Sequence, residues 1–231
     1  LVDDGSTDNT PSILADYAER DPRIILVMNR RNAGLTASLN KGLAVASGAY
    51  VARLDADDMA LPNRLAQQVD FLDRNSDYVL LGSAYTWIDA SGRKTGATFP
   101  PTDDTSIKWQ LLFNNSFGHS TVMLRRSALI AAGLEYDMYY SQTQDYDLWA
   151  RFLRAGRGRN LPEPLVLYRL HDAQDTHTQA ACQLAFALEV AQANLRSLGF
   201  CLSREQVILL RGVYEKNAAL RLDKIEAGMV F

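Results

Sequence analysis

Short apolar runs alternate with helix-like segments over the first 75 residues, and this order constrains the fold more than any other feature. Apolar runs end near residues 2, 28 and 54, and apolar residues at helical spacing follow each of them. The connections are short. A β-α-β-α-β-α order with short links is typical of a doubly wound α/β fold, so we expect a mostly parallel sheet with helices on both faces.

Acidic side chains follow two of the predicted strands. Asp3 and Asp4 come directly after the first apolar run, and the acidic segment 55–58 follows the strand predicted over 49–54. In doubly wound sheets the ligand lies beyond the carboxyl ends of the strands. We therefore expect both acidic turns at one rim of the sheet, facing one crevice.

The segment 55–58 has the sequence Asp-Ala-Asp-Asp. Like charges this close raise one another's pKa unless a cation lies among them. The spacing of Asp55 and Asp57 lets two carboxylates converge on one hard divalent ion, with coordination positions left for phosphate oxygens. Such a site suits Mg²⁺ or Mn²⁺ bound to a nucleotide diphosphate. The alternative interpretation is an exposed acidic turn before a helix that starts at a proline.

Composition narrows the classes of function. A formal charge of −3 and the lack of a long basic run argue against a nucleic-acid binder. Cys182 and Cys201 are too few for a disulfide framework, and their apolar helical surroundings predict small buried side chains in a reducing compartment. No apolar run approaches the ~18–20 residues that span a bilayer. We expect a cytoplasmic protein, and contact with the inner face of the membrane stays open.

The pattern changes after residue 78. We expect strands over 78–88, 94–99, 119–124 and 160–170, and helices over 103–113, 127–132 and 144–155. From residue 178 the composition becomes helical, so we predict one domain over 1–176 and a helical extension over 177–231. An apolar stripe from Leu184 to Leu198 is expected to pack on the core or on a partner, which leaves a homo-oligomer open.

Four groups of residues together resemble glycosyltransferase family 2, over about residues 1–171. They are Val2-Asp3-Asp4-Gly5-Ser6-Thr7-Asp8-Asn9-Thr10, Asn32-Ala33-Gly34-Leu35 with Asn40-Lys41-Gly42, Gly48-Ala49-Tyr50-Val51 leading into Asp55-Ala56-Asp57-Asp58, and Gln144-Asp145-Tyr146-Asp147-Leu148-Trp149-Ala150-Arg151. The resemblance implies an inverting enzyme of GT-A fold that uses Mn²⁺ or Mg²⁺. Its implied donor is a nucleotide-diphosphate sugar, with a UDP-sugar as first choice, and its implied acceptor is a glycan, a lipid-linked sugar or a cell-envelope polymer.

The resemblance also implies roles for single residues. It places Asp4 against the base of the donor, with Asp3 beside it. It gives donor contact to Asp55 and metal binding to Asp57, with Asp55 as a further ligand and Asp58 as an alternative for either role. Asp145 is the implied catalytic base, which takes the proton of the acceptor hydroxyl.

The loop 32–34 and His171 are further candidates, and Gly34 and His171 have two interpretations each. Asn32 and Gly34 shape the loop beside the nucleotide in the family, but a turn at the entry of a helix explains Gly34 equally well. His171 resembles a family position near the diphosphate, where it is a third metal ligand or a phosphate contact. A capping or surface histidine is the other interpretation of His171.

The sequence departs from the family pattern in two places. Gln144 stands where the family often has Glu, although the aspartate that the chemistry requires is retained at Asp145. The family's first strand is absent, since the sequence opens in the closing residues of a strand, and we expect a segment upstream. A truncated or degenerate binding or assembly module of the same fold is therefore the alternative function. A nucleotidyltransferase is disfavoured because no basic Gly-rich loop is present.

Overall fold

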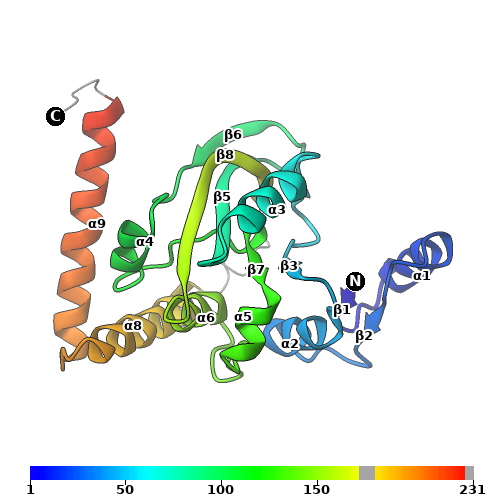
Figure 1. The fold of residues 1–231 in the computed structure, drawn as a ribbon, viewed down its shortest axis with the longest axis horizontal. Coiled ribbons are helices and arrows are strands. Elements are labelled where there is room, and N and C mark those ends of the chain that lie inside the picture. The colour runs from blue at the N-terminus through cyan, green and yellow to red at the C-terminus, as the bar shows by residue number, and fades with distance from the viewer. Residues whose placement is uncertain (172–179, 227–231) are drawn as a thin grey trace.

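The computed structural model describes residues 1–171 and 180–226, with side chains for 1–171 and 181–216 (Figure 1). Strands and helices alternate through the first third of the chain, as predicted. They are β1 (Val2–Asp3), α1 (Thr10–Arg20), β2 (Val27–Met28), α2 (Leu35–Val45), β3 (Tyr50–Ala52), β4 (Met59–Ala60) and α3 (Arg64–Arg74). Only the short strand β4 has no counterpart among the predicted elements.

The later elements also follow the predicted order. The predicted strand 119–124 begins as a 3₁₀ turn and becomes a strand only at Met123. The elements are β5 (Tyr78–Ile88), β6 (Lys94–Thr98), α4 (Asp104–Gln110), η1 (His119–Thr121), β7 (Met123–Arg125), α5 (Arg126–Ala131), α6 (Gln144–Phe152), β8 (Arg157–Arg169), α8 (Ala180–Ser197) and α9 (Arg204–Glu226).

The strands form two sheets. β1 and β2 pair in parallel as a two-stranded sheet, and the larger sheet has the order β3-β7-β5-β8-β4, with β6 paired to β5. Within the larger sheet β5 and β8 are parallel, whereas the pairs β3–β7, β5–β7, β5–β6 and β4–β8 are antiparallel. The α/β class is confirmed, but this sheet is mixed rather than mostly parallel. Helices no longer alternate regularly with strands after residue 78, and the tight turn 89–93 can join only antiparallel neighbours.

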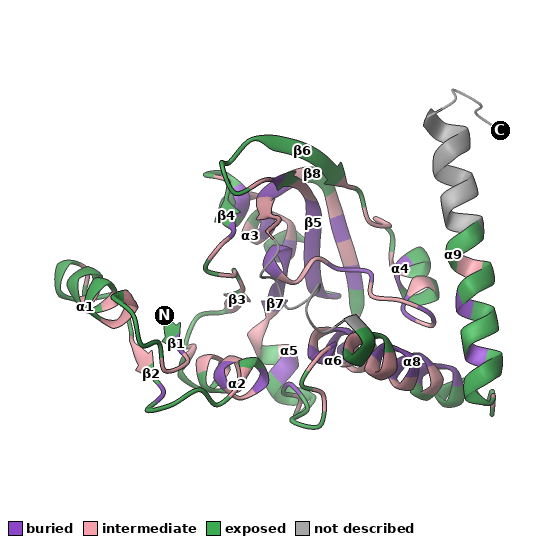
Figure 2. Cartoon of the chain, turned by 180° about the vertical axis from the view of Figure 1, so that it is seen from behind, coloured by how far each residue is buried: buried purple, intermediate pink, exposed green. Residues whose placement is uncertain are grey.

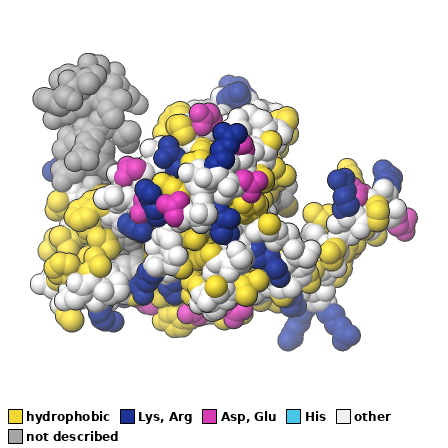
Figure 3. All heavy atoms as spheres, viewed as in Figure 1, with side chains coloured by type: hydrophobic (Ala, Val, Ile, Leu, Met, Phe, Trp, Pro, Cys, Tyr) yellow, Lys and Arg dark blue, Asp and Glu magenta, His cyan; other side chains and the backbone are white. Residues whose placement is uncertain are grey.

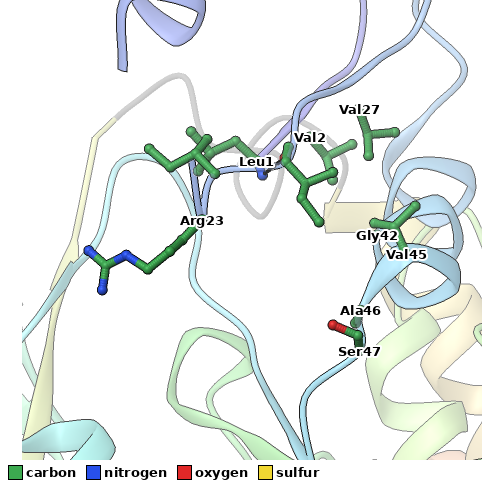
Figure 4. A pocket seen from close by; sticks show the side chains of 10 residues that line it. Leu1, Val2, Arg23, Val27, Gly42, Val45, Ala46 and Ser47 are labelled. Atoms are coloured by element: carbon green, nitrogen blue, oxygen red, sulfur yellow. Dashed lines mark hydrogen bonds between the residues drawn. The ribbon is translucent and has the colours of Figure 1, made fainter. Parts of the chain in front are cut away.

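The unit β1–α1–β2 lies to one side of the larger sheet (Figure 1). Helix α1 buries no residue, and Met28 of β2 is exposed, although the run 23–28 predicts a buried strand. β2 has a strand neighbour on one side only, so its other edge is unpaired, and no residue of α1 is buried against it. Between β1, β2 and α2 lies a hollow of about 370 Å³ lined by Leu1, Val27 and Val45, among others (Figure 4). Its lining includes no carboxylate, so it is separate from the predicted site.

The main core lies on both faces of β5, which is buried along most of its length (Figure 2). Leu81 packs with Leu72 of α3 on one face, and Leu80 packs with Trp149 of α6 on the other. Successive side chains of a strand point to opposite faces of the sheet. Helices therefore cover both faces, as predicted, and α6 is held against the sheet by a fully buried tryptophan.

The two C-terminal helices pack on the rest of the chain. Leu188, Ala191 and Leu195 of the predicted apolar stripe are buried, in one cluster with Phe113 and Val207. The stripe thus packs mainly within the chain. The boundary predicted near residue 176 lies outside the described residues, so the division into two domains stays a prediction.

Exposed apolar side chains remain around the junction of α8 and α9. Figure 3 shows hydrophobic atoms gathered in this region, and Leu198, Phe200, Leu209 and Val213 are among the exposed residues. A homo-oligomer through these helices stays a prediction. The two cysteines of this region are exposed, so the expectation that they are buried is wrong. Among the described helices, none combines the length and the hydropathy that crossing a bilayer requires.

Gly5 fixes the turn that presents Asp3 and Asp4. It has φ +78°, and a Cβ there would lie 2.6 Å from the backbone carbon of Arg31, whereas Gly92 has φ +85° with nothing within 4 Å. We expect Gly92→Ala to cost about 1–2 kcal/mol of unfolding free energy for the left-handed backbone alone. Gly5→Ala should cost roughly 1–3 kcal/mol more, because backbone must move. Denaturant unfolding of both variants checks this, and equal losses would contradict it.

Candidate active site

The acidic segment 55–58 follows β3 and gathers three carboxylates. One oxygen from each of Asp55, Asp57 and Asp58 lies within 4.8 Å of the others. β3 ends at Ala52, so these side chains lie at the carboxyl end of a strand, as expected. Three acidic groups at this separation repel one another in the absence of a cation, because each carries a full negative charge when ionised.

Residues at and just after the end of β8 contact the acidic segment. His171 Nε2 lies 3.1 Å from Asp57 Oδ2, and the backbone amide of Arg169 donates to Asp58 Oδ1 at 2.8 Å. These contacts depend on β4, whose Met59 pairs with Leu167 of β8. The pairing of β4 with β8 therefore brings His171 beside Asp57, where it is placed to share a cation with that carboxylate.

Asp58 has an oxygen that the fold leaves unsatisfied. Its side chain is 7% exposed, and Oδ2 is buried without a hydrogen-bond partner among the described residues. Burial raises the pKa of Asp58 and outweighs the lowering by Ser120 and by the amide of Arg169, and the neighbouring charges of Asp57 and Asp55 raise it further. An unsatisfied buried oxygen is costly unless something binds it. Carboxylate oxygens with one imidazole form a suitable donor set for Mg²⁺ or Mn²⁺, so the residues present fit the predicted cation.

Asp55 has different partners from its two neighbours. Both of its carboxylate oxygens accept from the guanidinium of Arg53, and Ser120 Oγ donates to Oδ2 at 3.1 Å. The side chain of Arg53 is only 10% exposed. Sequence analysis missed Arg53, although a single charged residue in a run predicted as a buried strand signals a buried ion pair.

A second buried arginine holds the backbone of this region. Arg64 of α3 is 1% exposed, and its Nη2 donates to the carbonyl of Arg53 at 2.8 Å and to that of Val122 at 3.1 Å. Gln68, one turn later, donates to the carbonyl of Thr121 at 2.7 Å. Burial lowers the pKa of Arg64 to about 10. Together the two side chains fix the end of β3 against η1, which positions Arg53 and Ser120.

The turn at Asp3 and Asp4 is held by its own contacts. Asp3 accepts from the hydroxyl of Ser6 and from its backbone amide at 3.2 Å. Asp4 accepts from Asn29 Nδ2 at 2.7 Å and from the amides of Ala33 at 2.8 Å and Gly34 at 2.9 Å. Burial opposes the charge of Asp4, but these hydrogen bonds prevail and lower its pKa. Asp4 therefore stays ionised and holds the neighbouring loop.

The loop 32–34 contains the turn expected at the entry of a helix. Gly34 has φ +90° and lies directly before α2, so it does form the turn at the entry of a helix. Asn32 Oδ1 accepts from the amide of Gly34 at 3.0 Å. Because Asp4 binds the same amide, the loop and the Asp3-Asp4 turn form one unit. Contact of these residues with a nucleotide stays a prediction.

Asp145 lies in the first turn of α6, after a strained residue. Thr143 has φ 61°, the one positive value for a non-glycine residue in the described chain, which marks a backbone held by its surroundings. Asn115 Nδ2 donates to Asp145 Oδ2 at 2.8 Å, and the amide of Tyr146 donates to Oδ1 at 2.8 Å. Burial raises the pKa of Asp145, while the amide of Tyr146, the charge of Arg53 and Asn115 lower it.

Arg53 connects the acidic segment with the surroundings of Asp145. Its charge acts on Asp145 and also on His119, whose pKa is well below its ordinary value because of burial and that charge. His119 Nε2 bonds to Tyr136 Oη at 2.9 Å, and its ring meets Trp149 edge to face. His119 is thus a neutral, hydrogen-bonded residue beside the site. The guanidinium of Arg53 thus pairs with Asp55 of the acidic segment, and its charge also lowers the pKa of Asp145.

Comparison with known proteins assigns the family. The model of glycosyl transferase family 2 matches residues 1–132, which is more than half of the chain. The chain belongs to glycosyltransferase family 2. The putative glycosyltransferase EpsE of Bacillus subtilis is 36% identical over 178 residues, covering 76% of this chain and 62% of that protein. The amylovoran biosynthesis glycosyltransferase AmsE of Erwinia amylovora is 30% identical over 171 residues, covering 73% and 63%.

Solved structures place this family 2 member in the GT-A fold. S. aureus TarS 1–349 in complex with UDP-GlcNAc superposes with a TM-score of 0.65 at 17% identity, over 89% of this chain and 59% of that chain. The mannosyltransferase PcManGT from Pyrobaculum calidifontis, in complex with GDP-Man and Mn²⁺, gives a TM-score of 0.51 at 20% identity, over 96% and 70%. At these identities the likeness concerns the fold. The chain spans less than two thirds of the length of the curated relatives described above.

Proposed function

We propose that this chain is the catalytic part of a metal-dependent, inverting glycosyltransferase. Its donor is a nucleotide-diphosphate sugar, with a UDP-sugar as first choice, and its acceptor is a glycan, a lipid-linked sugar or a cell-envelope polymer. One observation carries the proposal: the carboxylate cluster contains the unsatisfied oxygen of Asp58, and its Asp55 accepts from Ser120, which follows the His119 that packs on Trp149 of α6, the helix of Asp145. AmsE supports a polysaccharide product, and the solved complexes support UDP- or GDP-linked donors.

The cation would be held by Asp57, Asp58 and His171. Asp57 and His171 already face one another, and Asp58 has a free oxygen. When bound, Mn²⁺ or Mg²⁺ neutralises charge on the diphosphate that leaves. Asp3 and Asp4 are proposed to contact the donor base from the neighbouring turn, with Asn32 and Gly34 shaping the loop beside it. A cytoplasmic location at the inner face of the membrane stays a prediction.

Asp145 is the proposed base. The acceptor hydroxyl oxygen attacks the anomeric carbon, its proton passes to a carboxylate oxygen of Asp145, and the electron pair of the broken carbon–oxygen bond leaves with the diphosphate. Attack opposite the leaving group inverts the configuration. Asn115 and the amide of Tyr146 each occupy one oxygen of Asp145, which orients the carboxylate and leaves lone pairs for the proton.

The full-length protein tests the proposal directly. Thermal shift with UDP-, GDP- and dTDP-sugars, each with and without Mn²⁺, is expected to show stabilisation by one donor class that requires the cation. Transfer to a glycan acceptor with inversion, followed by NMR of the anomeric proton, then establishes the reaction. Absence of cation-dependent stabilisation by every donor would favour the alternative, a non-catalytic module. The exposed apolar residues around α8 and α9 favour that alternative.

The pH dependence of transfer follows from Asp145. The base must be ionised, so activity falls as the pH falls through its pKa, which burial raises above the ordinary value. Asn115 stabilises the ionised form. We therefore expect Asn115→Ala to move the acid limb of kcat/KM to higher pH, measured by pH profiles of both proteins. Asn63→Ala, at an exposed residue before α3, is the control and should leave the limb in place. An acid limb of kcat/KM at unchanged pH in Asn115→Ala would contradict the assignment of Asp145 as the base.

A further inference from the structure

Arg53 is held on every side by the fold. Its backbone amide donates to the carbonyl of Val122 at 3.1 Å, and its own carbonyl accepts from Arg64 at 2.8 Å. Its side chain is 10% exposed, and its guanidinium contacts Asp55 and Ser120, the latter at 3.2 Å. A charge this far from water must be compensated by its partners. Arg53 is therefore part of a constructed cluster rather than a surface ion pair.

Asp55 is committed to this cluster. Its two oxygens accept from the planar fork of Arg53, its Oδ2 also accepts from Ser120, and its backbone amide donates to Ser120 Oγ at 3.1 Å. A bidentate pair of this kind fixes both position and orientation of the carboxylate. Asp58, in contrast, has a buried oxygen without a described partner, and Asp57 contacts an imidazole. The three carboxylates thus divide into one that is occupied and two that remain available.

We propose that Arg53 is a positioning residue that holds Asp55 against Ser120, so that Asp57 and Asp58 are the carboxylates that bind the cation. This inference rests on the proposed function. In this arrangement Asp55 maintains the shape of the loop through its bonds to Arg53 and Ser120, and its neighbours bind the cation and the diphosphate. Arg53 acts through Asp55, not by contact with the donor.

A double-mutant cycle of Arg53→Gln and Asp55→Asn tests the proposal in the full-length protein. Each single variant breaks the same pair, and we expect kcat to fall by roughly 100-fold, as misplacement by about 1 Å can cause. The double variant should lose no more than the more damaged single variant, because residues that act as a unit are not additive. Affinity for Mn²⁺ in the presence of UDP, measured by calorimetry, should stay within about threefold in all three, because Asp57 and Asp58 keep their oxygens and what changes is the placement of the bound diphosphate relative to Asp145.

Two further variants separate positioning from charge and from general destabilisation. Arg53→Lys keeps the charge but lacks the planar fork, so it should recover only part of kcat. Arg23→Gln breaks an exposed pair with Asp21 that also uses both carboxylate oxygens, and it should change neither kcat nor affinity for Mn²⁺. Full recovery in Arg53→Lys would overturn the role of the fork.

Two results would overturn the positioning role of Arg53, and a third would overturn the proposed function. Multiplicative losses in the double variant would show that Arg53 acts independently of Asp55 and would overturn it. Loss of Mn²⁺ affinity in Asp55→Asn as large as in Asp57→Ala would make Asp55 a ligand and overturn it as well. If the wild-type protein binds no Mn²⁺ with any nucleotide, the proposed function fails. Melting temperatures without ligand then show separately whether Arg53 and Asp55 are coupled.

Discussion

Replacing Asp145 by Asn is expected to reduce sugar transfer by roughly 10²–10⁴-fold, because the neutral amide cannot accept the proton of the acceptor hydroxyl. The amide has nearly the shape of the carboxylate, and its oxygen can still accept from Asn115 or from the amide of Tyr146. Burial raises the pKa of Asp145, so the negative charge of its carboxylate costs more free energy in the folded protein than in water. The variant should therefore melt at the same temperature as the wild type or higher, and should bind UDP with Mn²⁺ equally well.

Asp147→Asn is the matched control for this variant. Asp147 lies in the same first turn of α6 and pairs with Arg151 at 2.6 Å. Its replacement removes one charge from the same helix terminus, and so controls for the effect of the helix dipole. Transfer by Asp147→Asn should remain close to that of the wild type. Full turnover by Asp145→Asn would remove the base assignment, and equal inactivity of both variants would show that the charge of the helix terminus, not one carboxylate, is required.

The positions of the two acidic turns after strands follow from the sequence because they depend on local chemistry. A strand that ends in two carboxylates and a glycine predicts the turn at Asp3 and Asp4, and the acidic segment 55–58 likewise comes soon after β3. The expectation that both turns lie at one rim of one sheet is wrong, since β1 and β3 belong to different sheets. Gly34 and the positive φ before α2 are equally local. Such features need no knowledge of distant partners, since strand ends and helix starts define where the side chains lie.

The contacts inside the site depend on pairings that a single sequence does not reveal. His171 reaches Asp57 only because β4 pairs with β8, and a two-residue strand leaves no periodic signal. Arg64 appears in an amphipathic helix as an ordinary polar residue, yet it is buried and binds two backbone carbonyls. The sequence also does not reveal which strands after residue 78 are parallel and which are antiparallel, because the regular alternation with helices stops there.

The separation of the β1–β2 unit from the larger sheet also limits sequence reasoning. Apolar runs predict strands but not which strands become neighbours, and β1 pairs with β2 while β3 pairs with β7. The described hydrogen bonds of Asp4 accordingly hold the neighbouring loop 29–34 and do not reach the acidic segment. Arg53 pairs with Asp55 of the acidic segment and its charge acts on Asp145, whereas Asp3 and Asp4 have no such described connection to that segment.

Asp57→Ala is expected to remove the dependence of nucleotide binding on the cation. Asp57 carries the carboxylate that faces His171 and lies beside the free oxygen of Asp58, so its loss leaves too few oxygens to hold the ion against water. Affinity for UDP in the presence of Mn²⁺ should fall by more than about tenfold, or about 1.4 kcal/mol. Calorimetry with Mn²⁺ and with EDTA measures this, and the two titrations of the variant should coincide.

Asp77→Ala provides the matched control for loss of a carboxylate. Asp77 pairs with Arg157 at 3.1 Å on the surface and lies outside the acidic cluster, so its replacement should leave binding with Mn²⁺ unchanged. Binding by Asp57→Ala that still depends on Mn²⁺ would contradict the assignment. The ion would then have to be held by Asp58 with another ligand, and Asp58→Asn would be the variant that abolishes the dependence. The variants Asp57→Ala and Asp58→Asn therefore decide which of these two carboxylates the cation requires. Neither result changes the role of Asp55, which its pair with Arg53 fixes.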